Sequence, residues 1–329
     1  MIETCRGYFN RLLAGGEITY TEALEIAGLD AAHDEEIIEV AHELTKRVWQ
    51  GRVSFCSILP AKRGLCGEDC AFCAQSVHHN CDIDPIALDD WDLQDILRYV
   101  RAMQAHGVDR FSLVTSGERL SVQDFDKTLA IYDAIRSEID IELCASLGSL
   151  DAERARMLKE RGITRYHHNV ETARAFFPSI CSTHLYEDKL ETIALAKSAG
   201  LSVCSGGIFS MGESMEQRIQ MAFELKALQV DCVPINILSP IPGTALEHQV
   251  LPPARELLRS IALFRLILPR IDLRFAGGRQ GALKDLEYEG YRAGINSAII
   301  GDFLTLNGTD CTEEIKQIRA RGFKPVRIT

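Results

Sequence analysis

The chain of 329 residues contains 36 Lys and Arg against 47 Asp and Glu, which gives a formal charge of −11 at pH 7. Because 46% of the residues are hydrophobic and 25% are charged, the composition is that of a globular protein and excludes long disordered segments. The acidic balance argues against a nucleic-acid partner. The apolar stretches are too short to span a membrane, and residues 1–16 lack the apolar centre of a secretory signal. We therefore expect a cytoplasmic protein.

Short runs of β-branched residues alternate along the chain with longer amphipathic segments. The predicted strands are Val53–Ser57, Phe111–Thr115, Glu142–Ala145, Arg165–Asn169, Ser202–Gly206, Val233–Ile237, Asp272–Phe275 and Ala298–Ile300. The predicted helices between them are Asp92–Ala105, Ser121–Glu138, Asp151–Arg161, Glu187–Ala199, Ser214–Leu228 and Pro253–Ile267.

This alternation favours an α/β fold, a closed (β/α)8 TIM-type barrel. The alternative is an open doubly wound sheet, but the sequence lacks the Gly-rich dinucleotide-binding motif that would support it. We expect residues 1–45 to form an N-terminal helical extension, and residues 46–329 to form the barrel with a closing C-terminal segment.

The sequence contains eleven cysteines, an odd number in a chain without an evident export signal, so we expect reduced thiols. Cys5, Cys232 and Cys311 stand alone among helical or apolar neighbours and are interpreted as small buried side chains. Cys81 is interpreted as a loop thiol. The positions of the remaining cysteines indicate that they bind metal clusters.

Three cysteines follow the first predicted strand, in the segment Cys66-Gly-Glu-Asp-Cys70-Ala-Phe-Cys73. This C-x3-C-x2-C pattern falls at the C-terminal edge of the barrel, where such folds carry their active sites. A structural zinc site normally has four ligands, whereas a cubane iron–sulfur cluster held by three thiolates keeps one iron open for another ligand. The pattern therefore favours a [4Fe–4S] cluster over coincidental cysteines or part of a zinc knuckle. Phe72 is either a core aromatic or lies over a bound ligand.

The aromatic residue before the third cysteine completes C-x3-C-x-aromatic-C, the hallmark of the radical S-adenosylmethionine (SAM) enzymes. From about residue 45 onward, the chain resembles the biotin synthase family of that superfamily. The segments that carry the resemblance are Cys56–Ser76, Tyr166–Thr172, Val203–Gly207, Val233–Asn236, Leu273–Arg279 and Gly301–Thr305.

The resemblance implies that SAM binds the open iron, is cleaved by one electron, and yields a 5′-deoxyadenosyl radical that takes hydrogen from dethiobiotin. Sulfur from an auxiliary iron–sulfur cluster then completes biotin. The resemblance also implies an electron donor such as flavodoxin or ferredoxin, and a homodimer. The alternatives are another radical SAM barrel enzyme of cofactor biosynthesis or amino-acid rearrangement, and a cluster protein that carries electrons or senses iron without catalysis.

A second set of ligands is predicted inside the barrel. Cys56, Cys144, Cys204 and Arg274 lie on the first, third, fifth and seventh predicted strands, and alternate strands of such a barrel contribute inward side chains to one layer. Three thiols in a layer with an arginine predict a buried cluster, whereas each cysteine alone would be an acceptable core residue.

The resemblance supports this layer, because better-known biotin synthases hold a [2Fe–2S] auxiliary cluster with three Cys and one Arg. This sequence has Ser112 where they have one of the cysteines, and Cys56 supplies a thiol from the neighbouring strand. The chain thus resembles a divergent branch in which the auxiliary cluster is expected to be of a larger, 4Fe type. Cys181 is a further candidate ligand.

The SAM contacts implied by the resemblance come from strand ends. They are Phe72, the segment Ser116-Gly117-Glu118 after the second strand, and Asn169 and Glu171 after the fourth. Glu171 is expected to accept hydrogen bonds from the ribose hydroxyls. Ser116–Glu118 is also an ordinary helix-entry turn, and Asn169 or Glu171 could instead cap the next helix.

The substrate contacts are expected from Asn169, Asn236 and Thr305. Asn236 can offer a donor and an acceptor to the cyclic urea of dethiobiotin. Thr305 occupies the position where the family binds the substrate carboxylate, although the next residue is Leu306 where the family often has Thr. His167 and His168 are adjacent on a strand and cannot both face the interior; His168 is interpreted as structural.

Overall fold

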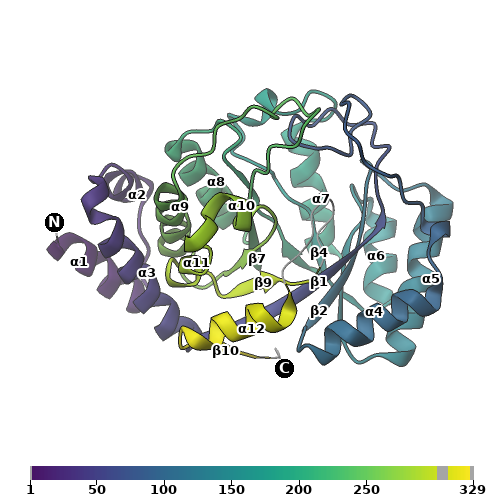
Figure 1. Cartoon of the computed structure of the whole chain (residues 1–329), viewed down its shortest axis with the longest axis horizontal. Helices are drawn as coiled ribbons and strands as arrows, with labels where there is room; N and C mark the ends of the chain where they lie inside the picture. The colour runs from purple at the N-terminus through teal and green to yellow at the C-terminus, as the bar shows by residue number, and fades with distance from the viewer. Residues whose placement is uncertain (1, 302–309, 327–329) are drawn as a thin grey trace.

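The computed structural model of the chain describes residues 2–301 and 310–326. Its strands are β1 (Arg52–Lys62), β2 (Arg110–Thr115), β3 (Glu142–Ser146), β4 (Ile163–His167), β5 (Ser202–Cys204), β6 (Gly207–Phe209), β7 (Cys232–Ile237), β8 (Asp272–Phe275), β9 (Ser297–Ile299) and β10 (Lys324–Pro325). All pairings are parallel, and the sheet closes on itself because β9 pairs with β8 on one side and β1 on the other. The predicted (β/α)8 barrel is confirmed (Figure 1).

The helices cover the outside of this barrel. They are α1 (Ile2–Leu13), α2 (Tyr20–Ala27), α3 (Asp34–Trp49), α4 (Leu93–Ala105), α5 (Val122–Glu138), α6 (Ala152–Glu160), α7 (Tyr186–Ser198), α8 (Met215–Ala227), α9 (Ala254–Ile267), α10 (Arg279–Leu283), α11 (Glu289–Arg292) and α12 (Cys311–Ala320). Capping residues fix where several begin: Asp92, Ser121 and Asp151 accept backbone N–H groups at the starts of α4, α5 and α6.

The strands sort their side chains by alternation. On β2, Phe111 and Leu113 are buried in the apolar layer under the helices, whereas Ser112 points into the barrel. Because successive residues of a strand face opposite sides, one face of a strand such as β2, β3 or β4 gives polar or thiol side chains to the barrel interior while its other face packs in the core.

The fifth strand position is split into β5 and β6 by Ser205 and Gly206. A Cβ atom on Gly206 would lie 2.0 Å from the carbonyl oxygen of Pro234 on β7, and one on Gly207 would lie 2.3 Å from that of Glu171. The backbones approach so closely that a side chain cannot fit at either position. The sequence predicted Ser202–Gly206 as a strand but not its continuation.

The N-terminal helices α1, α2 and α3 lie beside α9 on one side of the barrel (Figure 1). Because α3 packs on the outer face of α9, every residue from Leu257 to Ile267 is buried. Arg259 of α9 forms a buried ion pair with Asp34 of α3 and donates to the carbonyl oxygen of Leu29 at 2.7 Å. These contacts fix the N-terminal helices on the barrel.

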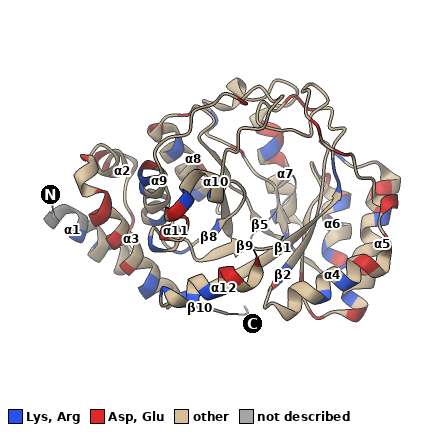
Figure 2. Ribbon diagram, viewed as in Figure 1, with Lys and Arg blue, Asp and Glu red and all other residues tan. Residues whose placement is uncertain are grey.

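Charged residues of both signs are interspersed along the outer helices (Figure 2). Across the described ranges, no helix has the length and apolar character needed to cross a membrane.

Candidate active site

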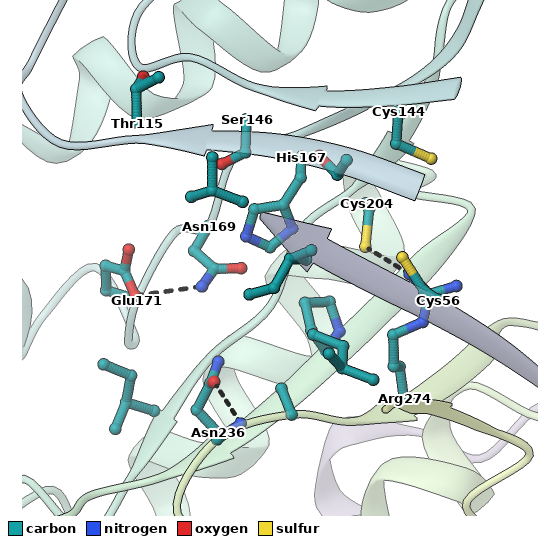
Figure 3. Close-up of a pocket in the computed structure, with 18 of the residues that line it drawn as sticks. Cys56, Thr115, Cys144, Ser146, His167, Asn169, Glu171, Cys204, Asn236 and Arg274 are labelled. Atoms are coloured by element: carbon teal, nitrogen blue, oxygen red, sulfur yellow. Dashed lines mark hydrogen bonds between the residues drawn. The ribbon is translucent and has the colours of Figure 1, made fainter. Parts of the chain in front are cut away.

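The barrel interior contains a cavity of about 370 Å³. Strand alternation builds its wall, as with Cys144 and Ser146 from β3 and Arg165 and His167 from β4. Figure 3 shows these side chains converging on one space, with the thiols at one end and Asn169 and Glu171 farther along. The cavity therefore has a sulfur-rich end and an end lined by amides and a carboxylate.

Cys56, Cys144, Cys204 and Arg274 lie together at the sulfur-rich end (Figure 3). Arg274 Nη1 lies 3.8 Å from Cys204 Sγ, and Arg274 Nε donates to Ser297 Oγ at 2.9 Å. Each of the three thiols is at most 3% exposed. The structure thus brings together the side chains that were expected to share a layer, in a position shielded from water.

Three buried guanidinium groups surround these thiols, from Arg110, Arg165 and Arg274. Arg110 pairs with Glu142 at 2.8 Å, but Arg165 Nη1 is 4.0 Å from the nearest carboxylate oxygen, on Asp272. Neither Arg165 Nη1 nor Arg274 Nη2 has a hydrogen-bond partner among the described residues. Buried cations require anionic partners and buried donors require acceptors. This set of residues fits an anionic, acceptor-rich group such as an iron–sulfur cluster.

The thiols differ in how readily they ionise. Burial raises the pKa of Cys56 and raises that of Cys144 to about 12. A hydrogen bond with Cys232 lowers the pKa of Cys204, with further lowering by the positive charge of Arg274. Cys232 is fully buried and pairs in register with Cys204. Among these thiols, Cys204 is therefore the one whose thiolate the surroundings favour most.

The loop with the cysteine triplet leaves β1 at the C-terminal edge of the barrel. Cys66 N donates to the carbonyl oxygen of Gln75 at 3.0 Å, and Cys73 N donates to that of Cys70 at 2.9 Å. Phe72 and Cys73 line the cavity. Burial raises the pKa of Cys70 and raises that of Cys73 to about 11, so these thiols stay protonated unless a metal displaces the proton. The chemistry of this donor set fits the expected cluster.

Asn169 and Glu171 follow β4 and line the cavity. Asn169 Oδ1 accepts from Gly206 N at 3.1 Å, and Asn169 Nδ2 donates to Glu171 Oε2 at 3.4 Å. Glu171 has the left-handed φ of 69°, held by backbone hydrogen bonds to Gly206 and Ile208. Such strain persists where the surroundings over-determine a residue, often at a functional site. Burial raises the pKa of the Glu171 carboxyl.

Asn236, the penultimate residue of β7, lines the other side of the cavity. Its Oδ1 accepts from Gly277 N at 3.0 Å and its Nδ2 donates to the carbonyl oxygen of Gly207 at 3.3 Å. These bonds fix the amide plane and leave one N–H and one lone pair for a ligand. Thr305 and Leu306 lie outside the described residues.

Ser116, Gly117 and Glu118, which follow β2, are not among the residues that line the cavity. Ser116 is buried and donates to the carbonyl oxygen of Gly64 at 2.7 Å, and the Glu118 carbonyl oxygen accepts from Ser149 N at 2.6 Å. Thr115, just before them, lines the cavity, and its buried Oγ1 has no hydrogen-bond partner among the described residues.

Sequence reasoning missed five polar residues of the cavity wall, namely Gln75, Thr115, Ser146, Arg165 and His167. Alternation could have found three of them, because Ser146 follows Cys144 by two positions, and His167 and Arg165 precede Asn169 by two and four. His168 does not line the cavity but stacks on Tyr166, with ring centroids 6.4 Å apart. Burial lowers the pKa of His167, which keeps its ring neutral.

Cys181 lies beside the triplet loop and not in the buried layer. Its Sγ is 3.8 Å from Cys70 Sγ, and it is not part of the cavity wall. The segment before α7 thus carries a fourth thiol to the triplet loop, which the sequence did not predict.

Solved structures share this architecture over nearly the whole chain. A methylornithine synthase superposes with a TM-score of 0.83 at 17% identity, over 97% of each chain. The FeFe-hydrogenase maturase HydG from Carboxydothermus hydrogenoformans superposes with a TM-score of 0.82 at 18% identity, over 99% of this chain and 80% of the other. At such identities the likeness shows the fold alone. The profile of the radical SAM superfamily matches residues 64–225, so the barrel and its triplet loop define a radical SAM enzyme.

A second profile, the Biotin and Thiamin Synthesis associated domain, matches residues 234–324. Curated biotin synthases are similar over nearly their full lengths. That of Heliobacterium modesticaldum is 47% identical over 94% of this chain and 95% of the relative, and that of Carboxydothermus hydrogenoformans is 45% identical over 96% and 99%. The chain belongs to the biotin synthase family, as its sequence motifs indicated. Its cofactors are therefore SAM, a [4Fe–4S] cluster and an auxiliary iron–sulfur cluster.

Proposed function

We propose that this chain inserts sulfur into dethiobiotin to form biotin, and that the residues described above divide the work. The observation that carries the proposal is that one cavity is lined by Phe72 and Cys73 of the triplet loop and, at its sulfur-rich end, by the thiol–guanidinium layer. A substrate held between them is exposed to hydrogen abstraction from one side and to a sulfur source from the other.

Cys66, Cys70 and Cys73 would hold the [4Fe–4S] cluster through their thiolates, and three ligands would leave a position for SAM. When both are bound, the cluster and SAM together would supply a carbon-centred radical that takes hydrogen from unactivated C–H bonds. The chain's own part is shielding. Aliphatic side chains such as Ile58, Val114 and Ile299 line the cavity and keep water and other hydrogen donors away from the reacting carbons.

The residues proposed to contact SAM hold it in place through hydrogen bonds and packing. The Glu171 carboxylate accepts hydrogen bonds from the ribose hydroxyls, because its backbone is locked and its side chain is steadied by Asn169. Phe72 covers the nucleoside from the loop. Residues Ser116, Gly117 and Glu118 shape the turn that receives the amino acid end of SAM, and Thr115 Oγ1 is free to add a hydrogen bond there.

Cys56, Cys144, Cys204 and Arg274 are proposed to hold the auxiliary cluster. The unpartnered Nη2 of Arg274 would donate to it, and the positive charges of Arg110 and Arg165 would balance its negative charge. Cys204 supplies the most easily ionised thiol. A cluster of the 4Fe type is the expected occupant.

Dethiobiotin is proposed to lie between the two centres. Asn236 and Asn169 present amide groups to the cyclic urea, each already oriented by hydrogen bonds to backbone atoms. Thr305 is proposed to bind the carboxylate at the other end of the substrate. The proposal further includes a flavodoxin or ferredoxin as electron donor, a homodimer, a cytoplasmic location, and a helical extension (1–45) carried by the barrel (46–329).

The test is anaerobic. The protein is reconstituted with iron and sulfide, then incubated with SAM, a reductant and dethiobiotin, and both 5′-deoxyadenosine and biotin are quantified. We expect biotin to form, and deoxyadenosine to accumulate faster when dethiobiotin is present. Deoxyadenosine formation that ignores dethiobiotin would reject the substrate, and a colourless protein with zinc at the triplet loop would reject the mechanism.

A further inference from the structure

The loop of residues 180–184 is docked on the triplet loop. The Ile180 carbonyl oxygen accepts from Ala71 N at 2.8 Å. The Asp69 carboxylate accepts from Ser182 N at 2.9 Å and from Thr183 N at 3.2 Å. These bonds hold two distant segments as one unit, so the side chains between them have fixed relative positions.

Three potential metal ligands meet at this junction. Cys70 Sγ, Cys181 Sγ and an imidazole nitrogen of His184 all lie within 4.8 Å of one another. The two sulfurs are 3.8 Å apart, and Cys181 Sγ is 3.3 Å from His184 Nδ1 and 3.8 Å from Nε2. Two thiolates on a tetrahedral ion, with bonds of about 2.3 Å, are separated by about 3.8 Å. The spacing is therefore that of a tetrahedral site.

The imidazole nitrogen nearer the thiols is Nδ1. His184 Nδ1 lies 3.3 Å from Cys181 Sγ and 2.5 Å from Glu68 Oε2. A cation bound at Nδ1 would therefore also lie near the Glu68 carboxylate, which can take a fourth ligand position. Cys181 is 7% exposed and the His184 side chain is 10% exposed, so little water competes for the ligand atoms.

The geometry points to a mononuclear metal site that exists before the cluster does: Cys70, Cys181 and His184 bind one thiophilic divalent cation, of the Fe²⁺ or Zn²⁺ class. This inference deepens the proposed function, because Cys70 is also assigned to the [4Fe–4S] cluster. Binding of the ion releases the two thiol protons to solvent. Since both occupants need Cys70, the single ion must leave or be incorporated when the cluster forms.

The test uses the full-length chain, freed of iron by anaerobic chelation and titrated with Co²⁺ as a spectroscopic probe. We expect one tightly bound Co²⁺ with visible tetrahedral bands and thiolate-to-cobalt charge transfer. Cys181→Ala and His184→Gln should each weaken this binding by at least about tenfold. Cys81→Ala, which removes a partly buried thiol from a different part of the loop region, should bind as the wild type does.

A reciprocal pair of variants separates this site from the cluster. Cys66→Ala removes a proposed cluster ligand and should keep the Co²⁺ spectrum, whereas Cys181→Ala should lose that spectrum and still assemble the [4Fe–4S] cluster, read as iron and sulfide content. An unchanged Co²⁺ spectrum in Cys181→Ala, or its loss in Cys66→Ala, would place the ion on the triplet and overturn the inference. Circular dichroism of each variant checks folding, and Cys181→Ser replaces Cys181→Ala if the latter unfolds. Wild-type biotin formation tests the proposed function independently.

Discussion

Replacing Arg274 by Met should stabilise the iron-free chain while abolishing the auxiliary cluster. The guanidinium of Arg274 is 3% exposed, and its Nη2 has no partner among the described residues. Exchanging a poorly paired buried charge for an apolar side chain of similar size stabilises a protein by about 1–4 kcal/mol. Loss of the hydrogen bond to Ser297 costs about 1.5 kcal/mol, although Ser297 keeps its contact with Ser54 at 3.1 Å.

The net expectation is a gain of about 1 kcal/mol. With an unfolding entropy of about 2.1 cal/mol/K per residue, this corresponds to a rise in Tm of about 1.5 °C for a chain of this length. The assay is calorimetry of the chelated protein, paired with iron and sulfide counts after anaerobic reconstitution, in which the auxiliary iron should be missing.

Arg265→Met is the matched control, because it also removes a buried arginine. Arg265 is fully buried but well paired, donating to the carbonyl oxygens of Gly294 at 2.9 Å and Leu268 at 3.0 Å and to Asn296 Oδ1 at 2.6 Å. Its loss leaves these acceptors unsatisfied and should cost about 3 kcal/mol or more. A lower Tm for iron-free Arg274→Met, or a full set of auxiliary iron in that variant, would refute the reasoning.

Further predictions concern the two cofactor sites. Cys56→Ser should keep cleaving SAM to 5′-deoxyadenosine while biotin formation falls at least about tenfold, and a normal biotin yield would remove Cys56 from the auxiliary site. Glu171→Gln should raise the KM for SAM about tenfold, since a hydrogen bond to a charged group contributes about 1.5 kcal/mol, and an unchanged KM would contradict the ribose contact. Because burial raises the pKa of Glu171, the wild-type KM for SAM should rise as the pH falls, beginning at a higher pH than for an ordinary glutamate, and Glu171→Gln should lack this rise. Removing iron by chelation should lower the Tm of the wild type, because the clusters bind the folded chain. The decrease should be smaller in Arg274→Met. Equal Tm values for the wild type with and without iron would contradict stabilisation by the two clusters.

The barrel could be predicted from the sequence because each strand repeats one signal, a short β-branched run between amphipathic helices. The predicted strand ends at Gly206, and its continuation into β6 could not be predicted, because two successive glycines carry no β-branched signal. Only the position of the Pro234 carbonyl oxygen, 2.0 Å from a Cβ on Gly206, reveals that the glycines serve close packing of strands.

The thiol layer was predictable for a related reason. Once strands are assigned, alternation decides which side chains face inward, and Cys56, Cys144 and Cys204 then share an end of the cavity. The contact between Cys181 and Cys70 could not be predicted from strand alternation. This contact depends on how two loops fold over the barrel mouth, and loop paths carry no periodic signal.

The break at Gly206 has a consequence for anyone wishing to reshape this enzyme for other substrates. Gly206 N fixes the Asn169 amide, and the spot beside it admits not even a methyl group. Substitutions at Gly206 would therefore disrupt folding. Ser146 lines the cavity and has no role assigned above, so substitutions at that position can alter the shape of the cavity while the strand packing around Gly206 stays intact.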